Sequence, residues 1–519
     1  MKLRGADVVA RRLAAAGVRR VFALSGNHVM PVYDAALEAK LELVHVRHEA
    51  AAVHMADAWA RITGEPGIAL VTGGPGHANA VGALYTALQA ESPVVLLSGH
   101  APIGELGKGA FQEMRQADIA APLAKDSWSA QSAEMLGADI DRALRIARSG
   151  RPGPVHLSLP SDVLEASVDA DAGGPGVTRP PVPIDESAAR NLLDGLKKAA
   201  RPVVIAGPQL ADRAGRQLLA RFEAASGIPA FVMESPRGVN DPALGLLAEV
   251  LAAADFVLLL GKQVDFTLRF GAAFGSACRI VPLSPGVEVR PSAERFAAAA
   301  EAGTPRAGTW FLEAREALRF RPAAWAKLVS APAGPVHPVE LFRAVQLLLE
   351  RDPEAVFVSD GGEIGQWSQA CLSAPHRLVN GVAGAIGPAL PFAVAARLAR
   401  PGSTVVAVMG DGTFGFHMAE MDTAMRYGTP FVAVVGNDAT WNAEYQIQLR
   451  SYGKERTHGL DLRPATRYDR VVEALGGHGE FVERAEQLHG ALERAAASGK
   501  PACVNVLIER VPAPTYKRI

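Results

Sequence analysis

Two short apolar runs joined by a helix-like segment, within residues 404–446, constrain the fold of this chain more than any other stretch. Residues 405–409 (VVAVM) and 431–435 (FVAVV) have the continuous apolar character of strands buried on both faces. The segment between them carries the apolar side chains Phe416, Met418, Met421 and Met425. A strand, a helix and a strand in this order predict a βαβ unit, and so a parallel sheet whose carboxyl ends are the usual place for a ligand.

Polar residues follow both of these strands. Gly410-Asp411-Gly412 comes after the first strand, and Gly436-Asn437-Asp438 comes after the second. Asp411 and Asp438 therefore offer two hard oxygen donors at one edge of the predicted sheet. Oxygen ligands suit Mg²⁺, which in turn favours a phosphate-bearing partner. The pattern predicts a magnesium and phosphate site at this edge.

Two other interpretations of the same residues stay open. Gly410-x-Gly412-x-x-Gly415 fits the dinucleotide fingerprint, with Asp438 where a ribose-binding acid is expected; this would indicate a nicotinamide-dependent oxidoreductase. Asp411 argues against it, because a carboxylate beside a pyrophosphate repels it unless a cation lies between them. The simplest alternative is a glycine-rich turn that binds no ligand.

The whole chain alternates helix and strand signals over 519 residues, which is enough for roughly three domains of about 150 residues each. Residues 166–186 and 331–338 are rich in proline and glycine, which is typical of linkers. We expect an α/β protein of three domains, each a mostly parallel sheet flanked by helices. The tail after Glu509 is expected to be a surface arm. The expected domains are residues 1–165, 187–325 and 338–519.

Further strands and helices are expected from the same alternation. Beyond the two strands above, the expected strands are residues 21–24, 41–46, 68–71, 93–98, 203–206, 256–261, 279–283, 356–359 and 503–508. The expected helices near the start of the chain are residues 7–16, 50–62 and 79–89.

Charge and composition bear on the partners and the compartment. The net charge of −1 gives no reason to expect nucleic acid or an anionic membrane as a partner. No apolar run approaches the roughly 20 residues of a membrane span, and Arg11 and Arg12 interrupt the apolar core that a signal peptide needs. The cysteines have neither metal-site spacing nor a disulfide pattern, so we expect a reducing, cytoplasmic location.

Gly-Asp-Gly followed some 25 residues later by Asn-Asn is the signature of thiamine diphosphate enzymes, and this chain resembles that family at Gly410-Asp411-Gly412 and Asn437-Asp438. Asp438 replaces the second asparagine of the signature. The resemblance implies thiamine diphosphate and Mg²⁺ as cofactors. It further implies that Asp411, Asp438 and the backbone carbonyl of Thr440 are metal ligands. Gly410, Gly412 and Thr413 would then contact the diphosphate.

A glutamate near the start of the chain stands in a second block that resembles this family. Residues 47–61 (RHEAAAVHMADAWAR) are similar to the corresponding block of acetolactate synthase. The resemblance implies that Glu49 is catalytic, with its carboxyl hydrogen-bonded to the aminopyrimidine of the cofactor, which carries the difficult chemistry. Partial burial would raise the pKa of such a carboxyl. Without this context, a glutamate at a helix start is usually a cap or a dipole partner.

Three further segments resemble parts of the family that contact the pyrimidine or the substrate. Residues 72–79 (TGGPGHAN) are similar to its pyrimidine loop, which implies cofactor contacts for Thr72, Gly73, Pro75 and Asn79. Gln112, in a Phe-Gln-Glu motif, would point at the substrate, and His28 stands where benzaldehyde lyase has an active-site histidine that could shuttle protons. A tight turn, a surface amide and an ordinary histidine are the corresponding alternatives.

Two glycine-containing segments of the expected third domain resemble the far side of the cofactor site. Residues 360–367 (DGGEIGQW) are similar to a loop that meets the diphosphate, which implies contacts from Gly362 and Glu363. Residues 384–387 (GAIG) are similar to Gly-x-Met-Gly, which implies that the Gly384 carbonyl accepts from the cofactor's amino group. Ile386, in place of methionine, would hold the cofactor bent.

The resemblance covers nearly the whole chain and predicts an enzyme that makes or breaks a C–C bond beside a carbonyl. An acetolactate synthase-like carboligase or decarboxylase acting on a 2-oxo acid is the first expectation. Alternatives are lyase activity like that of benzaldehyde lyase or 2-hydroxyacyl-CoA lyase, a nicotinamide enzyme, and a non-catalytic family member. The Gly-Met-His-Gly motif that contacts flavin in acetolactate synthases is missing, so FAD is not expected. The family also implies a homodimer or homotetramer with active sites at the subunit interface.

Overall fold

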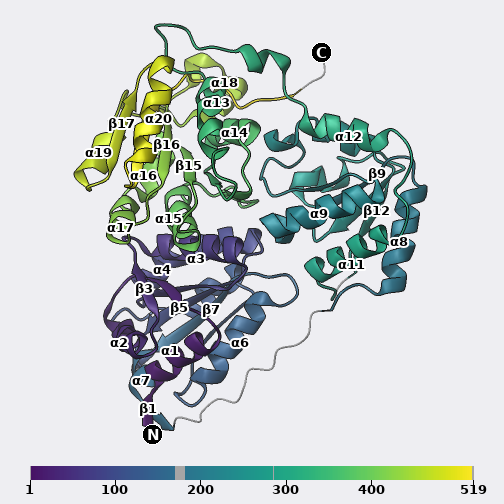
Figure 1. Cartoon of the computed structure of the whole chain (residues 1–519). Helices are drawn as coiled ribbons and strands as arrows, with labels where there is room; N and C mark the ends of the chain where they lie inside the picture. The colour runs from purple at the N-terminus through teal and green to yellow at the C-terminus, as the bar shows by residue number, and fades with distance from the viewer. Residues whose placement is uncertain (1, 170–181, 285, 517–519) are drawn as a thin grey trace. The chain divides into compact units, whose positions relative to one another are not determined.

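The computed structural model describes residues 2–169, 182–284 and 286–516 (Figure 1). Its contacts divide the chain into two compact units: unit 1 comprises residues 1–180, 394–399 and 422–427, and unit 2 comprises residues 181–393, 400–421 and 428–519. Within the described residues, three parallel sheets flanked by helices account for all but one short antiparallel pair of strands. The predicted α/β class is therefore confirmed.

The first sheet lies in unit 1 and has six parallel strands. β4 and β5 are buried along their whole length, because their apolar runs face helices on both sides. In spatial order the strands are β3 (Glu42–His45), β2 (Arg20–Ala23), β4 (Gly67–Val71), β5 (Val94–His100), β7 (Val155–Pro160) and β6 (Asp126–Ser129). The longer helices of this part are α1 (Gly5–Ala15), α2 (Met30–Glu38), α3 (Glu49–Thr63), α4 (Pro75–Gln89) and α6 (Leu136–Arg148).

The second sheet lies in unit 2 and has four parallel strands. Buried apolar residues fill both of its faces in two separate clusters. The strands in spatial order are β10 (Ala230–Val232), β9 (Pro202–Ala206), β11 (Phe256–Leu260) and β12 (Arg279–Pro282). The longer helices are α8 (Glu186–Lys198), α9 (Arg213–Ser226), α10 (Leu247–Ala253), α11 (Val289–Glu301) and α12 (Trp310–Arg319).

The third sheet has six parallel strands, and its central strands contain the two apolar runs that the sequence singles out. Gly410 pairs with Gly436 in register, so the residues after both strands leave the sheet at the same edge. The strands in spatial order are β14 (His376–Val379), β13 (Val356–Ser359), β15 (Val405–Gly410), β16 (Val432–Asn437), β18 (Ala502–Leu507) and β17 (His478–Val482). The helices are α13 (Pro338–Leu349), α14 (Gly362–Cys371), α15 (Ala389–Ala399), α16 (Asp411–His417), α17 (Glu420–Arg426), α18 (Asn442–Tyr452), α19 (Tyr468–Ala474) and α20 (Leu488–Ala497).

The expected strands are all present to within a few residues, and five other strands of the three parallel sheets were not anticipated. β6 and β17 are sheet edges with polar sequences (DSWS and HGEFV), β10 and β14 are short, and β7 carries buried His156 and Ser158 between its apolar residues. The prediction of a single continuous helix after β15 is wrong. The helix is broken into α16 and α17, and Phe416 and Met418 are partly exposed, whereas Met421 is buried.

The prediction that residues 166–186 form a linker is partly wrong. Its first residues form β8 (Ser167–Asp169), which pairs with β1 (Lys2–Arg4), while residues 170–181 lie outside the described part of the chain. The exact domain boundaries and the cytoplasmic location stay predictions. In the described residues, none of the helices has the length and apolar character needed to cross a bilayer.

Candidate active site

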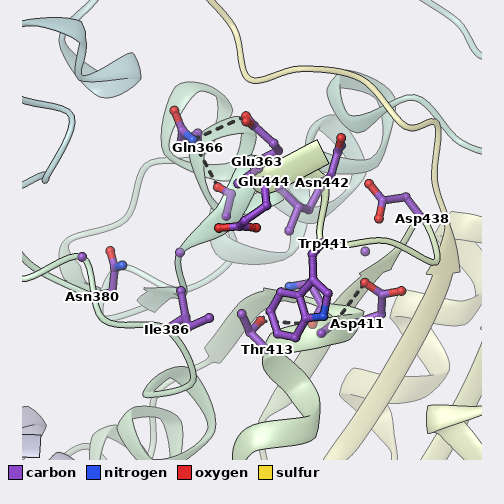
Figure 2. A pocket seen from close by; sticks show the side chains of 18 of the residues that line it. Glu363, Gln366, Asn380, Ile386, Asp411, Thr413, Asp438, Trp441, Asn442 and Glu444 are labelled. Carbon is purple, nitrogen blue, oxygen red and sulfur yellow. Dashed lines mark hydrogen bonds between the residues drawn. The ribbon is translucent and has the colours of Figure 1, made fainter. Parts of the chain in front are cut away.

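A cavity of about 300 Å³ opens at the carboxyl ends of the third sheet, entirely within unit 2 (Figure 2). It is formed by segments far apart in the sequence, which follow β10, β13, β14, β15 and β16. All of the residues predicted from the second half of the chain line it: Gly362, Glu363, Gly384, Ile386, Gly410, Asp411, Gly412, Thr413, Asp438 and Thr440. The structure thus brings this half of the predicted site together, while the role of each residue stays a prediction.

Asp411 is buried and Asp438 is half-buried, and neither carboxylate forms an ion pair with another described residue of the cavity. The Asp411 Oδ1 atom accepts a hydrogen bond from the Gly412 N–H at 3.0 Å, but its buried Oδ2 atom has no partner among the described residues. Burial raises the pKa of Asp411 to about 6. Burial, and next the charge of Asp411, raise the pKa of Asp438 to about 7. Two neighbouring acids whose ionised forms repel each other are stabilised by a cation between them.

The donors present fit Mg²⁺. Within the described part of the chain, no three His, Cys, Asp or Glu side chains form a complete metal cage. A cation at Asp411 and Asp438 would therefore draw its other ligands from a backbone carbonyl, water and phosphate oxygens, which is how Mg²⁺ is usually held. Thr440 is buried beside them and lines the same cavity. The donor set supports the predicted metal site, including the aspartate at the position where the family has asparagine.

Glycines at this edge are required by close packing. A Cβ atom on Gly412 would lie 2.8 Å from the ring of Trp441, and one on Gly361 would lie 2.7 Å from Ile386. By contrast, a Cβ on Gly415 would meet no described atom within 4 Å. The third glycine of a dinucleotide fingerprint is needed for close helix packing, so the free space at Gly415 argues against that interpretation.

The buried carboxylate of Asp360 connects residues 360–367 with residues 384–387 on the far side of the cavity. Asp360 accepts hydrogen bonds from the N–H groups of Gly361, Gly387 and Ala389 at 2.7, 2.9 and 3.1 Å. The Asn380 side chain also donates to the Ala385 carbonyl at 2.9 Å. These bonds hold residues 384–387 against the start of α14. Figure 2 shows Ile386 and Asp438 on opposite sides of the cavity.

The described residues of the tail after Glu509 lie at the surface, as expected, and they also contact the walls of this cavity. The Ala513 N–H donates to the Glu363 carboxylate at 2.6 Å, and the Trp367 indole N–H donates to the Pro512 carbonyl at 3.0 Å. The Asn442 side chain donates to the Val511 carbonyl at 3.1 Å. We call residues 511–516 the C-terminal strap, because they connect α14 with α18.

The residues predicted from the first half of the chain form a second cluster, within unit 1. Glu49 begins α3 and is buried, and its Oε2 atom accepts a hydrogen bond from the Asn79 side-chain amide at 3.0 Å. A Cβ on Gly76 would lie 2.8 Å from Thr72 and 3.4 Å from Glu49, so the loop fits closely against the carboxyl. Gly73 and Pro75 belong to this same loop, which leads into α4.

His28 and Gln112 both lie against this loop. The His28 Nδ1 atom is 3.3 Å from the Thr72 hydroxyl, and the imidazole stacks on Phe111 with centroids 6.0 Å apart. Burial lowers the pKa of His28, which favours the neutral ring. Gln112 has a positive φ of 58°, and a Cβ on Gly74 would lie 2.7 Å from its carbonyl. The three predicted catalytic residues therefore contact one loop.

Sequence reasoning missed the buried polar residues behind the loop. Gln116 accepts from the Gly74 N–H at 2.8 Å and donates to the Gly99 carbonyl at 3.0 Å and to the Ser158 hydroxyl at 3.1 Å. His77 lies 2.9 Å from the Ser98 hydroxyl, and its ring centroid is 4.6 Å from that of His156. Ser98, His156 and Ser158 are polar residues inside otherwise apolar strands, which is a signal in the sequence, whereas Gln116 and His77 lie in helices and give no such signal.

Acidification is expected to destabilise unit 1 through His77. Burial lowers the pKa of this imidazole from 6.5 to about 4. Between these values the unfolded chain binds a proton that the folded chain does not, so the free energy of unfolding falls as the pH falls, by about 3 kcal/mol over the whole interval. Thermal midpoints from pH 7.5 to pH 4.5 should fall less steeply for His77→Asn than for the wild type; identical slopes would contradict this assignment.

The regions of the chain that match known proteins contain both clusters. Residues 3–119 match the family described as thiamine pyrophosphate enzyme, N-terminal TPP binding domain, and residues 360–506 match the corresponding C-terminal TPP binding domain. A probable acetolactate synthase of Mycobacterium bovis is 36% identical over 538 residues, covering 98% of this chain and 96% of the relative. 2-Hydroxyacyl-CoA lyase 2 of Homo sapiens is 30% identical over 577 residues, covering 98% and 90%.

Proposed function

This chain belongs to the thiamine pyrophosphate enzymes, and on that premise we propose that it uses thiamine diphosphate and Mg²⁺ to form or break a C–C bond beside a carbonyl, with a 2-oxo acid as its donor substrate. The unpartnered, buried Oδ2 atom of Asp411, beside the raised pKa of Asp438, is the observation that carries the cofactor assignment. The similarity to an acetolactate synthase over nearly the whole length supports the reaction class.

The residues that would hold the cofactor fall into two groups. Asp411, Asp438 and the Thr440 carbonyl would bind the metal, with diphosphate oxygens and water completing its coordination. The backbone at Gly362, Gly410 and Gly412 and the Thr413 hydroxyl would bind the diphosphate. The Gly384 carbonyl and the Ile386 side chain would orient the aminopyrimidine. When bound, thiamine diphosphate supplies a carbon nucleophile and an electron sink.

Residues of unit 1 would transfer protons and orient the substrate. Glu49 would hold a proton on the aminopyrimidine through its free carboxyl oxygen, while Asn79 fixes the other oxygen at 3.0 Å. Thr72, Gly73 and Pro75 would cover the pyrimidine. Neutral His28 would exchange a proton with the substrate oxygen, and Gln112 would orient the substrate carbonyl.

We further propose that the protein is a homodimer or homotetramer in which Glu49 of one subunit completes the cavity of another. Thiamine enzymes of this family are typically oligomeric, and closed symmetric oligomers are the usual form. We do not propose FAD as a cofactor, because the proposed function requires only the residues that would bind thiamine diphosphate and Mg²⁺.

A product assay tests the reaction. The protein with thiamine diphosphate and Mg²⁺ is incubated in parallel with pyruvate, benzoin and a 2-hydroxyacyl-CoA, and the products are read by proton NMR after acid quenching. Acetolactate from pyruvate is the expected result. Aldehyde release from benzoin or from the acyl-CoA would instead favour a lyase, as the similarity to 2-hydroxyacyl-CoA lyase 2 suggests. No product from any of the three would contradict the proposal.

A further inference from the structure

The cavity has an excess of acidic side chains where an anionic diphosphate is expected. Among the described residues that line it, Arg237 alone is cationic, and the acidic ones are Glu363, Asp411, Asp438 and Glu444. Figure 2 shows Asp411 and Asp438 on the same side of the cavity. Asp438 stands where the family signature has a neutral asparagine, so its ionised form adds one negative charge there. Such a charge attracts Mg²⁺ but repels a diphosphate, unless a nearby cation offsets it.

Arg510, which follows β18, contacts the loop that carries Asp438. Its Nη2 atom donates to the Asp438 carbonyl at 3.2 Å, and its guanidinium lies over the Tyr445 ring, 5.0 Å from the ring centroid. The chain before it is attached to the same loop, since the Ile508 N–H donates to the Asn437 carbonyl at 3.1 Å. Arg510 is not among the described residues that line the cavity. Its guanidinium is therefore held next to the predicted metal site without contributing to the cavity wall.

The positive charge of Arg510 is only weakly neutralised by its ion-pair partner. That partner is Asp461, at 3.5 Å, whose side chain is 78% exposed. An ion pair so open to solvent is screened by water. The charge of Arg510 also acts on the site itself, where it opposes the burial that raises the pKa of both Asp411 and Asp438. Arg510 is thus a source of positive charge for the two aspartates of the cavity.

The same contacts hold residues 438–441, which we call the metal loop, in an unfavourable conformation. Ala439 has a positive φ of 55°, a region that residues with a Cβ rarely adopt. The Thr440 hydroxyl donates to the Asp461 carboxylate at 3.1 Å, at the oxygen that also faces Arg510. Asp461 therefore connects Arg510 with the residue whose carbonyl is the third predicted metal ligand. The loop and the arginine form one connected arrangement.

We propose that Arg510 offsets the charge of Asp438, so that a cavity with two aspartates can hold both Mg²⁺ and a diphosphate. This inference rests on the proposed function, because it concerns the same site. Arg510 is a positioning residue in this role, since it acts through the metal loop and through its charge. Mg²⁺ is positive and the diphosphate is negative, so removal of a nearby positive charge shifts their two affinities in opposite directions. A purely structural role would weaken both.

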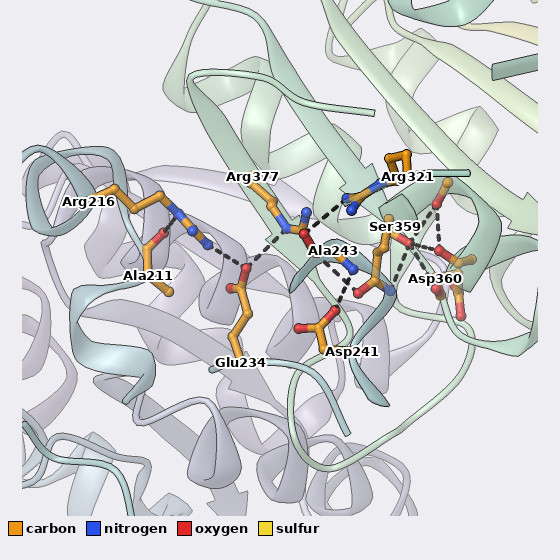
Figure 3. A network of polar contacts seen from close by, with 12 residues as sticks. Ala211, Arg216, Glu234, Asp241, Ala243, Arg321, Ser359, Asp360 and Arg377 are labelled. Carbon is orange, nitrogen blue, oxygen red and sulfur yellow. Dashed lines mark hydrogen bonds and ion pairs between the residues drawn. The ribbon is translucent and has the colours of Figure 1, made fainter. Parts of the chain in front are cut away.

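Arg510→Gln tests the proposal, and Arg216→Gln is the matched control. The Arg216 side chain has a similar exposure, 37% against 34%, and it likewise pairs with a carboxylate of unit 2, that of Glu234 at 2.5 Å. Figure 3 shows the Glu234 carboxylate between Arg216 and Arg377, which lies 3.0 Å from it. Arg216 does not line the cavity. Its replacement therefore measures the general effect of removing a paired, half-buried arginine.

Two titrations measure the two affinities separately. Mn²⁺, used in place of Mg²⁺ and counted as the free ion by EPR, should bind Arg510→Gln about 3- to 10-fold more tightly than the wild type. Thiamine diphosphate, titrated by calorimetry at saturating Mg²⁺, should bind this variant about 3- to 10-fold more weakly. Arg216→Gln should bind both ligands as the wild type does. Both shifts should shrink at about 1 M salt, where the Debye length is about 3 Å.

Two further variants separate charge from shape. Arg510→Lys keeps the positive charge but loses the planar group over Tyr445, so both affinities should stay within about threefold of the wild type. The double variant Asp438→Asn with Arg510→Gln has the net charge of the wild type. It should bind thiamine diphosphate within about threefold of the wild type, although Arg510→Gln alone does not.

The outcomes distinguish this inference from the proposed function. Weaker binding of both Mn²⁺ and thiamine diphosphate by Arg510→Gln would overturn the inference and make Arg510 a structural residue. Unchanged binding of both ligands, or equal shifts in Arg216→Gln, would also overturn it, while the proposed function would stand. A wild type that binds neither ligand would refute the proposed function and this inference together.

Discussion

Glu49→Gln is expected to lower kcat by about 100- to 10,000-fold, the range of a general acid–base contribution, with little change in fold. Glutamine has the same shape and can still accept from Asn79, whose amide lies 3.0 Å from the Glu49 carboxylate. It cannot exchange a proton with the aminopyrimidine. Steady-state turnover of pyruvate measures the effect, and thiamine diphosphate binding measured by calorimetry should fall far less than kcat. A kcat close to that of the wild type would mean that Glu49 only caps α3.

Mixing two inactive variants controls for misfolding and tests the shared site. If Glu49 of one subunit acts in the cavity of another, Glu49→Gln and Asp411→Asn subunits that exchange freely in a dimer should regain about a quarter of the wild-type activity, because one site of each mixed dimer has both residues. No recovery, in a mixture shown to contain mixed dimers, would place both residues in a site within one subunit.

Asp411→Asn is expected to abolish stabilisation by the cofactor. A ligand at 100 times its Kd stabilises the folded state by about 2.7 kcal/mol. In the wild type, thiamine diphosphate and Mg²⁺ should therefore raise the melting temperature, and EDTA should reverse the rise. Asparagine keeps the size of Asp411 but removes the charge that the buried, unpartnered Oδ2 atom would offer to the metal. Differential scanning fluorimetry with and without both ligands is the measurement.

Asp438→Asn is the informative control. An amide oxygen at this position can still bind Mg²⁺, and its neutrality removes the repulsion with Asp411 that contributes to the raised pKa of Asp438. The cofactor-dependent rise in melting temperature should therefore persist in Asp438→Asn. If both variants lose the rise equally, the negative charge of Asp438 is itself required; if neither does, the metal binds elsewhere.

Local sequence predicted those parts of the fold in which the two faces of a strand are both buried. The runs at 405–409 and 431–435 are apolar throughout, and they became β15 and β16 with small differences at their ends. β6 and β17 are sheet edges, so they need no apolar sequence and give no such signal. The break between α16 and α17 also gave no signal in the sequence. The apolar spacing of a helix continues through Met418, where the helix itself is interrupted.

The candidate site was predictable where its residues belong to short motifs. The Gly-Asp-Gly and Gly-x-x-Gly segments line one cavity because parallel strands end at one edge. Gln116 belongs to no such motif. Its importance comes from a tertiary neighbour, Gly74, and contacts between distant segments are not visible in one sequence.

The C-terminal strap affects when the cavity can form during synthesis. Glu363 is translated about 150 residues before Ala513, its backbone hydrogen-bond donor. Until the ribosome has released residues 511–516, the buried Glu363 carboxylate, the Trp367 indole and the Asn442 amide lack these partners. A nascent chain can therefore fold its first sheet early, but it acquires a finished cofactor pocket only after residues 511–516 have been synthesised.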